Sequence, residues 1–149
     1  MSLQSFTDAY IEAALWSSQY GEEGEEKNMD DGEHDIAPET LAKMEADCKA
    51  FYGTCSNLLT EGACFRSAQG VKSHSFASLR SDSHSNRGSG RYHVDEQAGH
   101  DFWLTRNGHG AGFWDGDWIE PAATILDKTS KHFGNVDLYV GDDRLIYQS

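Results

Sequence analysis

The sequence predicts an α+β protein in which two N-terminal helices are followed by a β-hairpin, a third helix and a second β-hairpin. Three segments with apolar residues at helical spacing predict the helices, and two of these segments begin at a proline. Two turn signals between apolar runs, Asn107-Gly108 and residues 141–144, predict the hairpins. We therefore expect one four-stranded, mainly antiparallel sheet packed by helices, in a single domain spanning residues 1–149.

A helix is predicted over residues 5–18, and a longer one begins at Pro38, where the missing proline N–H costs nothing. Apolar residues of the longer helix recur at steps of three and four positions, namely Leu41, Met44, Cys48, Phe51, Cys55 and Leu58. Cys48 and Cys55 fall on this face about 10 Å apart by helix rise. That separation is too long for a disulfide, so we expect both cysteines to be core residues.

The chain is acidic, with 25 Asp and Glu residues against 12 Lys and Arg residues and a formal net charge of −13. This charge argues against ordinary nucleic-acid binding and against adhesion to anionic membranes, but it permits binding to a basic surface. Residues 20–34 combine glycines with a run of acids, which is typical of a flexible, solvated loop. The alternative is an acidic strip that imitates a phosphate backbone, with the partner-binding residues Glu22, Glu23, Glu25, Glu26, Asp30 and Asp31.

Residues 65–92 form a basic segment within this acidic chain. They are rich in Ser, Gly and His and have no sustained hydrophobic period, which predicts a flexible surface loop. The alternative is a basic arm that becomes ordered on a partner, and this is the one segment for which we consider direct contact with nucleic acid. Its single acid is Asp82, and its basic residues are Arg66, Lys72, Arg80, Arg87 and Arg91.

The glycine- and tryptophan-rich stretch 99–118 is predicted to be the central hairpin, with Asn107-Gly108 as its two-residue turn. In this register large apolar side chains fall on both faces. His100 and His109 are then about 20 Å apart along the strand, which argues against a shared metal ion, so no metal or catalytic residue is predicted. One aromatic face is an alternative ligand-binding site formed by Trp103, Arg106, Asn107, His109 and Trp114.

After the central stretch, Pro121 begins a third helix that Gly134 ends, and two short apolar runs form the second hairpin. Asp142 and Asp143 are explained as turn residues of that hairpin. No P-loop, dinucleotide-binding glycine motif, His-Glu-x-x-His or Gly-x-Ser-x-Gly motif is present, so no cofactor is expected. Three cysteines leave at least one thiol unpaired, and neither a signal peptide nor a membrane-length apolar run is found, so we expect a cytoplasmic protein.

Two segments carry a resemblance to known proteins. Residues 99–115 read Gly-His-Asp-Phe-Trp-Leu-Thr-Arg-Asn-Gly-His-Gly-Ala-Gly-Phe-Trp-Asp, and residues 136–147 contain Asp-Leu-Tyr-Val-Gly-Asp-Asp followed by Tyr147. In these segments the chain resembles a group of small acidic proteins encoded by tailed bacteriophages and prophages. The resemblance extends more loosely to the two N-terminal helices, and the basic loop at 65–92 is longer than in the group. It implies a phage origin and no catalytic residues.

These observations favour a non-enzymatic, phage-encoded acidic protein that inhibits a host nucleic-acid-handling defence complex, in the manner of an anti-CRISPR protein and by nucleic-acid mimicry. The expected partner is a host protein complex with a basic nucleic-acid-binding surface. The alternative is a small-molecule or nucleotide-binding protein, including a metal-assisted hydrolase, that uses the Trp- and His-rich hairpin. A third hypothesis is a structural protein of the virion. The sequence leaves the oligomeric state open.

Overall fold

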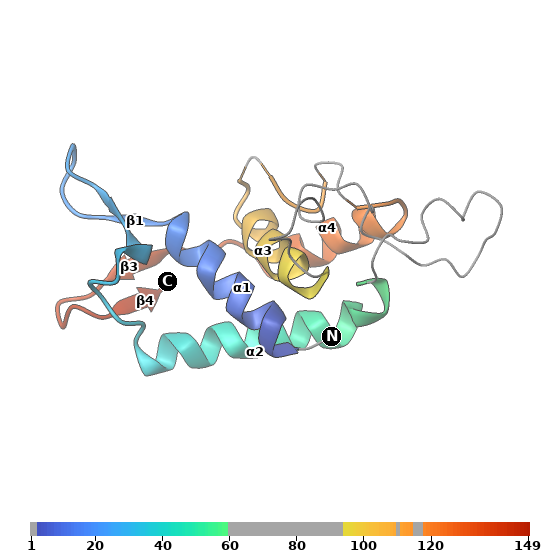
Figure 1. The fold of residues 1–149 in the computed structure, drawn as a ribbon, viewed down its shortest axis with the longest axis horizontal. Helices are drawn as coiled ribbons and strands as arrows, with labels where there is room; N and C mark the ends of the chain where they lie inside the picture. Colours follow the sequence, from blue (N-terminus) through green and yellow to red (C-terminus); the bar gives the residue numbers. More distant parts are fainter. Residues whose placement is uncertain (1–2, 60–93, 110, 115–117) are drawn as a thin grey trace, which may run out of the picture.

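The computed structural model describes residues 3–59, 94–109, 111–114 and 118–149. Within these ranges it contains four α-helices, two short 3-10 helices and four strands (Figure 1). In chain order they are α1 (Leu3–Trp16), β1 (Gln19–Tyr20), β2 (Lys27–Asn28), η1 (Met29–Asp31), α2 (Pro38–Cys55), η2 (Ser56–Leu58), α3 (Val94–Arg106), α4 (Ala122–His132), β3 (Leu138–Val140) and β4 (Ile146–Gln148).

The core lies between the helices. Helix α1 packs against both α2 and α3, and α4 packs against α3 (Figure 1). Phe51 of α2 stacks on Phe102 of α3 with ring centroids 4.2 Å apart, and Phe6 of α1 stacks on Phe51 at 5.6 Å. All three rings are fully buried, so this aromatic cluster joins three helices that are distant in sequence.

The prediction of one four-stranded sheet is wrong. The described residues contain two separate two-stranded antiparallel sheets, β1–β2 and β3–β4, and the predicted central hairpin is replaced by helix α3 and the chain after it. Asn107-Gly108 ends this helix instead of turning a hairpin. Gly108 has φ +69°, its N–H donates to the carbonyl of Thr105, and the N–H of His109 donates to the carbonyl of Leu104. This bond pair is the Schellman motif of helix C-termini, which uses the same positive φ that a hairpin turn would use.

Helix α3 lacks an amphipathic pattern because it is buried on nearly every side. Ten of its residues, from Asp95 to Arg106, are buried, and several of them are polar. The polar ones have partners: Asp101 accepts hydrogen bonds from Trp118 Nε1 at 2.7 Å and from Gln97 Nε2 at 2.9 Å. A helix of this kind shows no clear period in its sequence, so the hydrophobic pattern alone could not predict it.

A close helix crossing depends on one glycine. A Cβ atom placed on Gly99 would lie 2.0 Å from the backbone carbonyl oxygen of Phe6 in α1. No side chain larger than hydrogen fits between the two backbones, so Gly99 sets the approach of α3 to α1. This is a packing role that the predicted hairpin did not assign to it.

The other expected elements are confirmed. Helix α2 begins at Pro38 and buries Met44, Cys48, Phe51 and Cys55, so the two cysteines are core residues as predicted. The second hairpin forms with Tyr139 opposite Tyr147 and Val140 opposite Ile146. Helix α4 (Ala122–His132) forms between Pro121 and Gly134 as predicted, and it buries Leu126 and Ser130, whereas Ile125 is 45% exposed.

The two hairpins lie at the same end of the molecule (Figure 1). The segment before α2 joins them, because the N–H of Ala37 donates to the carbonyl of Ile146 and the N–H of Ile146 donates to the carbonyl of Asp35. In the described part of the chain, no helix combines the length and the apolar character that crossing a bilayer requires.

Candidate functional site

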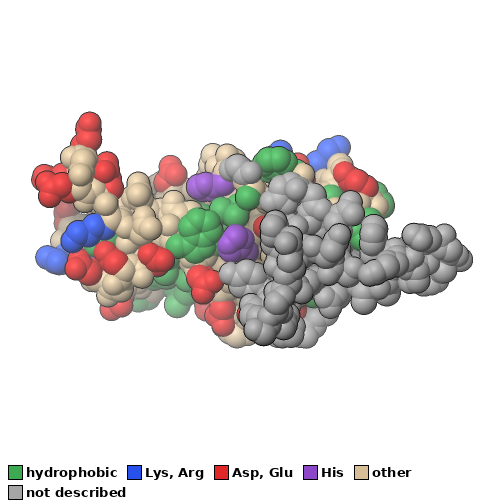
Figure 2. Space-filling model, turned by 45° about the horizontal axis from the view of Figure 1, so that its top comes forward, with side chains coloured by type: hydrophobic (Ala, Val, Ile, Leu, Met, Phe, Trp, Pro, Cys, Tyr) green, Lys and Arg blue, Asp and Glu red, His purple; other side chains and the backbone are tan. Residues whose placement is uncertain are grey.

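Exposed carboxylates gather at the end of the molecule that carries the hairpins. The six predicted partner-binding acids are all exposed, and Asp142 and Asp143 add two more from the β3–β4 turn. Figure 2 shows red acidic side chains over this end, most densely where the β1–β2 hairpin projects. We call this set the acidic end: Glu22, Glu23, Glu25, Glu26, Asp30, Asp31, Asp142 and Asp143.

Local contacts hold the backbone of the acidic end. Met29 of η1 is 2% exposed and anchors the segment in the core, and its N–H donates to the carbonyl of Ser18. Tyr20 Oη donates to Asp31 Oδ2 at 2.5 Å and lies 3.1 Å from a carboxylate oxygen of Glu33. The segment predicted as a flexible loop at 20–34 therefore contains short regular elements, namely a two-residue strand pair and one 3-10 turn.

Tyrosine hydroxyls lower the pKa of two of these carboxylates. The hydrogen bond from Tyr20, followed by one from the Glu33 N–H, holds the pKa of Asp31 below its usual value. In the second hairpin Tyr147 Oη donates to Asp143 Oδ2 at 2.5 Å, which lowers the pKa of Asp143 and raises the pKa of Tyr147 to about 12. The charged, hydrogen-bond-accepting form of both carboxylates therefore persists to lower pH than in an ordinary aspartate.

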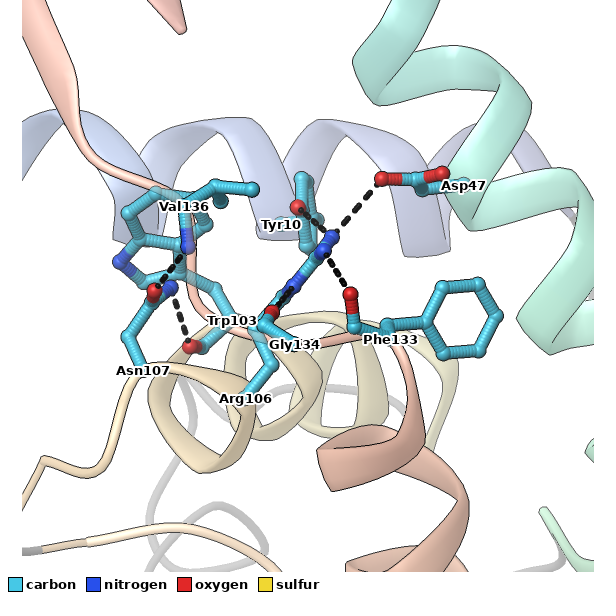
Figure 3. Close-up of polar contacts among 8 residues, drawn as sticks. All are labelled: Tyr10, Asp47, Trp103, Arg106, Asn107, Phe133, Gly134 and Val136. Atoms are coloured by element: carbon cyan, nitrogen blue, oxygen red, sulfur yellow. Dashed lines mark hydrogen bonds and ion pairs between the residues drawn. The ribbon is translucent and has the colours of Figure 1, made fainter. Parts of the chain in front are cut away.

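The second predicted set of residues is divided among different places. Arg106 is 3% exposed and joins all four helical regions (Figure 3). Its guanidinium donates to Tyr10 Oη at 3.0 Å, to Asp47 Oδ2 at 2.8 Å, to the Gly134 carbonyl at 2.8 Å and to the Phe133 carbonyl at 2.9 Å. These bonds and the ion pair with Asp47 occupy the guanidinium, so Arg106 stabilises the fold and does not face a ligand.

Trp103, Asn107 and His109 do line one cavity, of about 340 Å³. It lies between the end of α1, the end of α3 and the start of β3, with Ser18 and Asp137 also on its wall. Trp103 is only 2% exposed, and its Nε1 donates to Ser17 Oγ at 2.8 Å. The Asn107 amide donates to the Trp103 carbonyl and accepts from the Val136 N–H. The Trp103 ring therefore offers little face for stacking on a ligand.

Trp114 does not line this cavity. It is 55% exposed and lies instead beside a smaller cavity of about 110 Å³ with Glu120, Thr124 and Asp127. The sequence placed Trp103 and Trp114 on one face of a hairpin, and this arrangement is wrong because Trp103 belongs to α3. The aromatic platform predicted from that face does not form.

The histidines of the central stretch form no metal centre in the described residues. The predicted 20 Å separation of His100 and His109 was based on the hairpin register, which α3 replaces. The His100 ring packs 5.5 Å from the ring of Trp16, and Asp101 is held by Trp118 and Gln97. No group of three potential metal ligands occurs among the residues that the structure describes. The basic loop at 65–92 lies outside these residues.

Sequence reasoning missed the tyrosines of the acidic end. Tyr139 and Tyr147 lie directly opposite each other in β3 and β4, with ring centroids 5.8 Å apart and planes 26° apart. The alternation of Leu138, Tyr139 and Val140 already places Tyr139 on the outer face of the predicted hairpin. Applying the same alternation to the second strand would have found the pair.

Comparison of the chain with protein-family models, with curated proteins and with solved structures yields no match. The function is therefore inferred from the geometry of the acidic end and of the cavity beside Trp103.

Proposed function

We propose that this chain is a non-enzymatic binding protein whose acidic end occupies a basic surface on a nucleic-acid-handling protein complex. The observation that carries the proposal is the gathering of eight exposed carboxylates at one end of the molecule, on the β1–β2 hairpin, the adjoining η1 and the β3–β4 turn. Carboxylates held in place, as Asp31 is by Tyr20 and Asp143 by Tyr147, imitate phosphates better than a free tail does, because less conformational entropy is lost on binding. The bound chain would exclude DNA or RNA from the same surface.

The resemblance of residues 99–115 to phage proteins suggests the biological setting. A phage protein of this kind would act on a host defence complex, and a CRISPR effector has the required basic channel. The net charge of −13 supports a protein partner, since it disfavours binding of the chain to the nucleic acid itself.

The test begins with affinity capture from a bacterial lysate by the immobilised chain, with mass spectrometry to identify the complex. The purified complex is then assayed for target DNA or RNA binding as the chain is added. We expect nucleic-acid binding to fall, and the inhibition to weaken at high salt because surface charges are screened. Unchanged nucleic-acid binding at saturating concentrations of the chain contradicts the proposal.

Charge-matched variants show whether the acidic end is responsible. Glu22→Gln combined with Glu23→Gln removes two charges from the acidic end, whereas Glu12→Gln combined with Glu45→Gln removes two exposed charges from helices α1 and α2. We expect only the first pair of substitutions to weaken binding. The expected loss of affinity is about 3- to 30-fold, because two exposed ion pairs contribute up to about 1 kcal/mol each. Equal effects of both pairs would indicate that net charge alone matters.

A second candidate function is the binding of a small polar molecule in the cavity beside Trp103. Its volume, about 340 Å³, falls within the range of small-molecule sites. The exposed His109 is the side chain best placed to contact such a ligand. A thermal-shift screen with nucleotides and divalent cations tests this candidate. A stabilising ligand whose effect is lost in His109→Ala and kept in Trp114→Leu supports it, and the absence of any shift counts against it.

A further inference from the structure

The outer face of the β3–β4 hairpin carries a shallow, open cavity bordered by aromatic and acidic side chains. The cavity measures about 540 Å³ and is lined by Tyr139, Tyr147, Asp142 and Asp143 together with the backbone near Gly141. Strand alternation explains the division of the hairpin: Leu138 and Ile146 point into the core, whereas Tyr139 and Tyr147 point away from it. Tyr139 is 48% exposed, so about half of this side chain faces solvent while its ring stacks on Tyr147.

The aromatic wall is fixed in place. The rings of Tyr139 and Tyr147 stack across the two strands, and the Tyr147 hydroxyl is held by Asp143. Asp143 also accepts the N–H of Leu145 through its other oxygen, at 3.1 Å. The ring faces are therefore presented in a defined orientation, with ionised carboxylate oxygens beside them.

A guanidinium group fits this combination better than an ammonium group does. Its planar surface stacks on an aromatic ring, while its N–H groups donate two parallel hydrogen bonds to a carboxylate. A lysine ammonium is a strongly hydrated point charge and gains less from the flat ring. The rings of Tyr139 and Tyr147 and the carboxylate of the exposed Asp142 all line this cavity.

We propose that this cavity, the tyrosine cavity, binds an arginine side chain of a protein partner. The inference rests on the proposed function, because it names the side chain that the acidic end recognises on the partner's basic surface. The acids of the β1–β2 hairpin supply long-range attraction, and the tyrosine cavity supplies selectivity for arginine over lysine. Arginine-rich surfaces are also those that bind phosphate groups bidentately, so the selectivity directs the chain to nucleic-acid channels.

The test uses two fluorescein-labelled peptides of equal length and charge, with four Arg-Gly or four Lys-Gly repeats, and fluorescence anisotropy with the full chain. We expect the arginine peptide to bind about three- to five-fold more tightly than the lysine peptide, as one exposed cation–π contact provides. Tyr139→Leu removes the more exposed of the two rings and is expected to make the two affinities equal. Trp114→Leu, which removes an exposed aromatic side chain elsewhere, is expected to keep the preference.

Equal affinities for the two peptides with the unmodified chain, or a preference that persists in Tyr139→Leu, overturn the inference. In that case salt-sensitive binding of both peptides, weakened by Glu22→Gln with Glu23→Gln, leaves the proposed function standing. The circular dichroism spectrum of Tyr139→Leu shows whether it is folded. Tyr147→Phe is the second variant: it keeps the ring face and loses only the hydroxyl contact with Asp143, so the preference should remain.

Discussion

Replacing Gly99 by alanine is expected to destabilise the protein strongly, because the close contact between α1 and α3 has no room for a methyl group. The added Cβ would lie 2.0 Å from the Phe6 carbonyl oxygen and 3.1 Å from the Tyr10 nitrogen. Both are backbone atoms, so no side-chain rotation relieves the overlap and the helices must separate by more than 1 Å, about the shortfall from an ordinary contact of 3.4 Å. Overpacking of this kind costs about 3 kcal/mol or more.

Gly53 provides the matched control. It is an exposed glycine within α2, and a Cβ at this position meets nothing within 4 Å. Gly53→Ala is therefore expected to stabilise the chain by about 0.5–1 kcal/mol through helix propensity. Urea denaturation followed by circular dichroism at the helix band measures both changes. In thermal unfolding followed at the same band, Gly99→Ala should lower Tm by about 6–12 °C for a chain of this size.

The two glycine variants separate the observed fold from the predicted one. A central hairpin would place Gly99 at its open end, where a methyl group is tolerated and the cost of Gly99→Ala is small. A change below about 0.5 kcal/mol, the usual limit for surface substitutions, would refute the reasoning about the helix crossing.

Two further predictions concern polar contacts. Arg106→Met is expected to cost about 3 kcal/mol in urea denaturation, because the buried Tyr10 hydroxyl and the Phe133 and Gly134 carbonyls lose their donor. Asp47→Asn is expected to cost about 2 kcal/mol, because it removes the charge that compensates the buried guanidinium. The double variant should cost less than the sum, and additive costs would contradict a shared network. Tyr147→Phe should raise the pKa of Asp143 towards 3.8, measured by NMR titration of its carboxyl carbon. The folded pKa lies below the unfolded value, so this bond stabilises the fold above pH 3.8 and is lost as the pH falls through the folded pKa. An unchanged midpoint would show that Tyr147 does not hold the carboxylate.

Parts of the candidate site could be predicted because they depend on local chemistry. The six acids of the N-terminal half are exposed, as a glycine-rich acidic run implies. The β3–β4 hairpin follows from alternating apolar residues around a Gly-Asp-Asp turn. That the two hairpins share one end could not be predicted, since it depends on Ile36 bridging to Ile146 across more than 100 residues of sequence.

The sequence by itself determined the helical period of α2, the burial of Cys48 and Cys55, and the acidic character of the chain. Each follows from the spacing or count of residue types. Only the tertiary structure decided the role of Asn107-Gly108. A positive φ at Gly108 serves a hairpin turn and a helix C-terminus equally well, so the local signal is the same for both.

The choice between the two was made by packing. Residues 94–106 fold as a helix because α1, α2 and the chain after α4 surround them: Gly99 admits the backbone of α1, and Arg106 bonds to Tyr10, Asp47 and the carbonyls that follow α4. Such a helix is buried on nearly every side and shows no amphipathic period. The information that specifies it lies in residues far away along the chain.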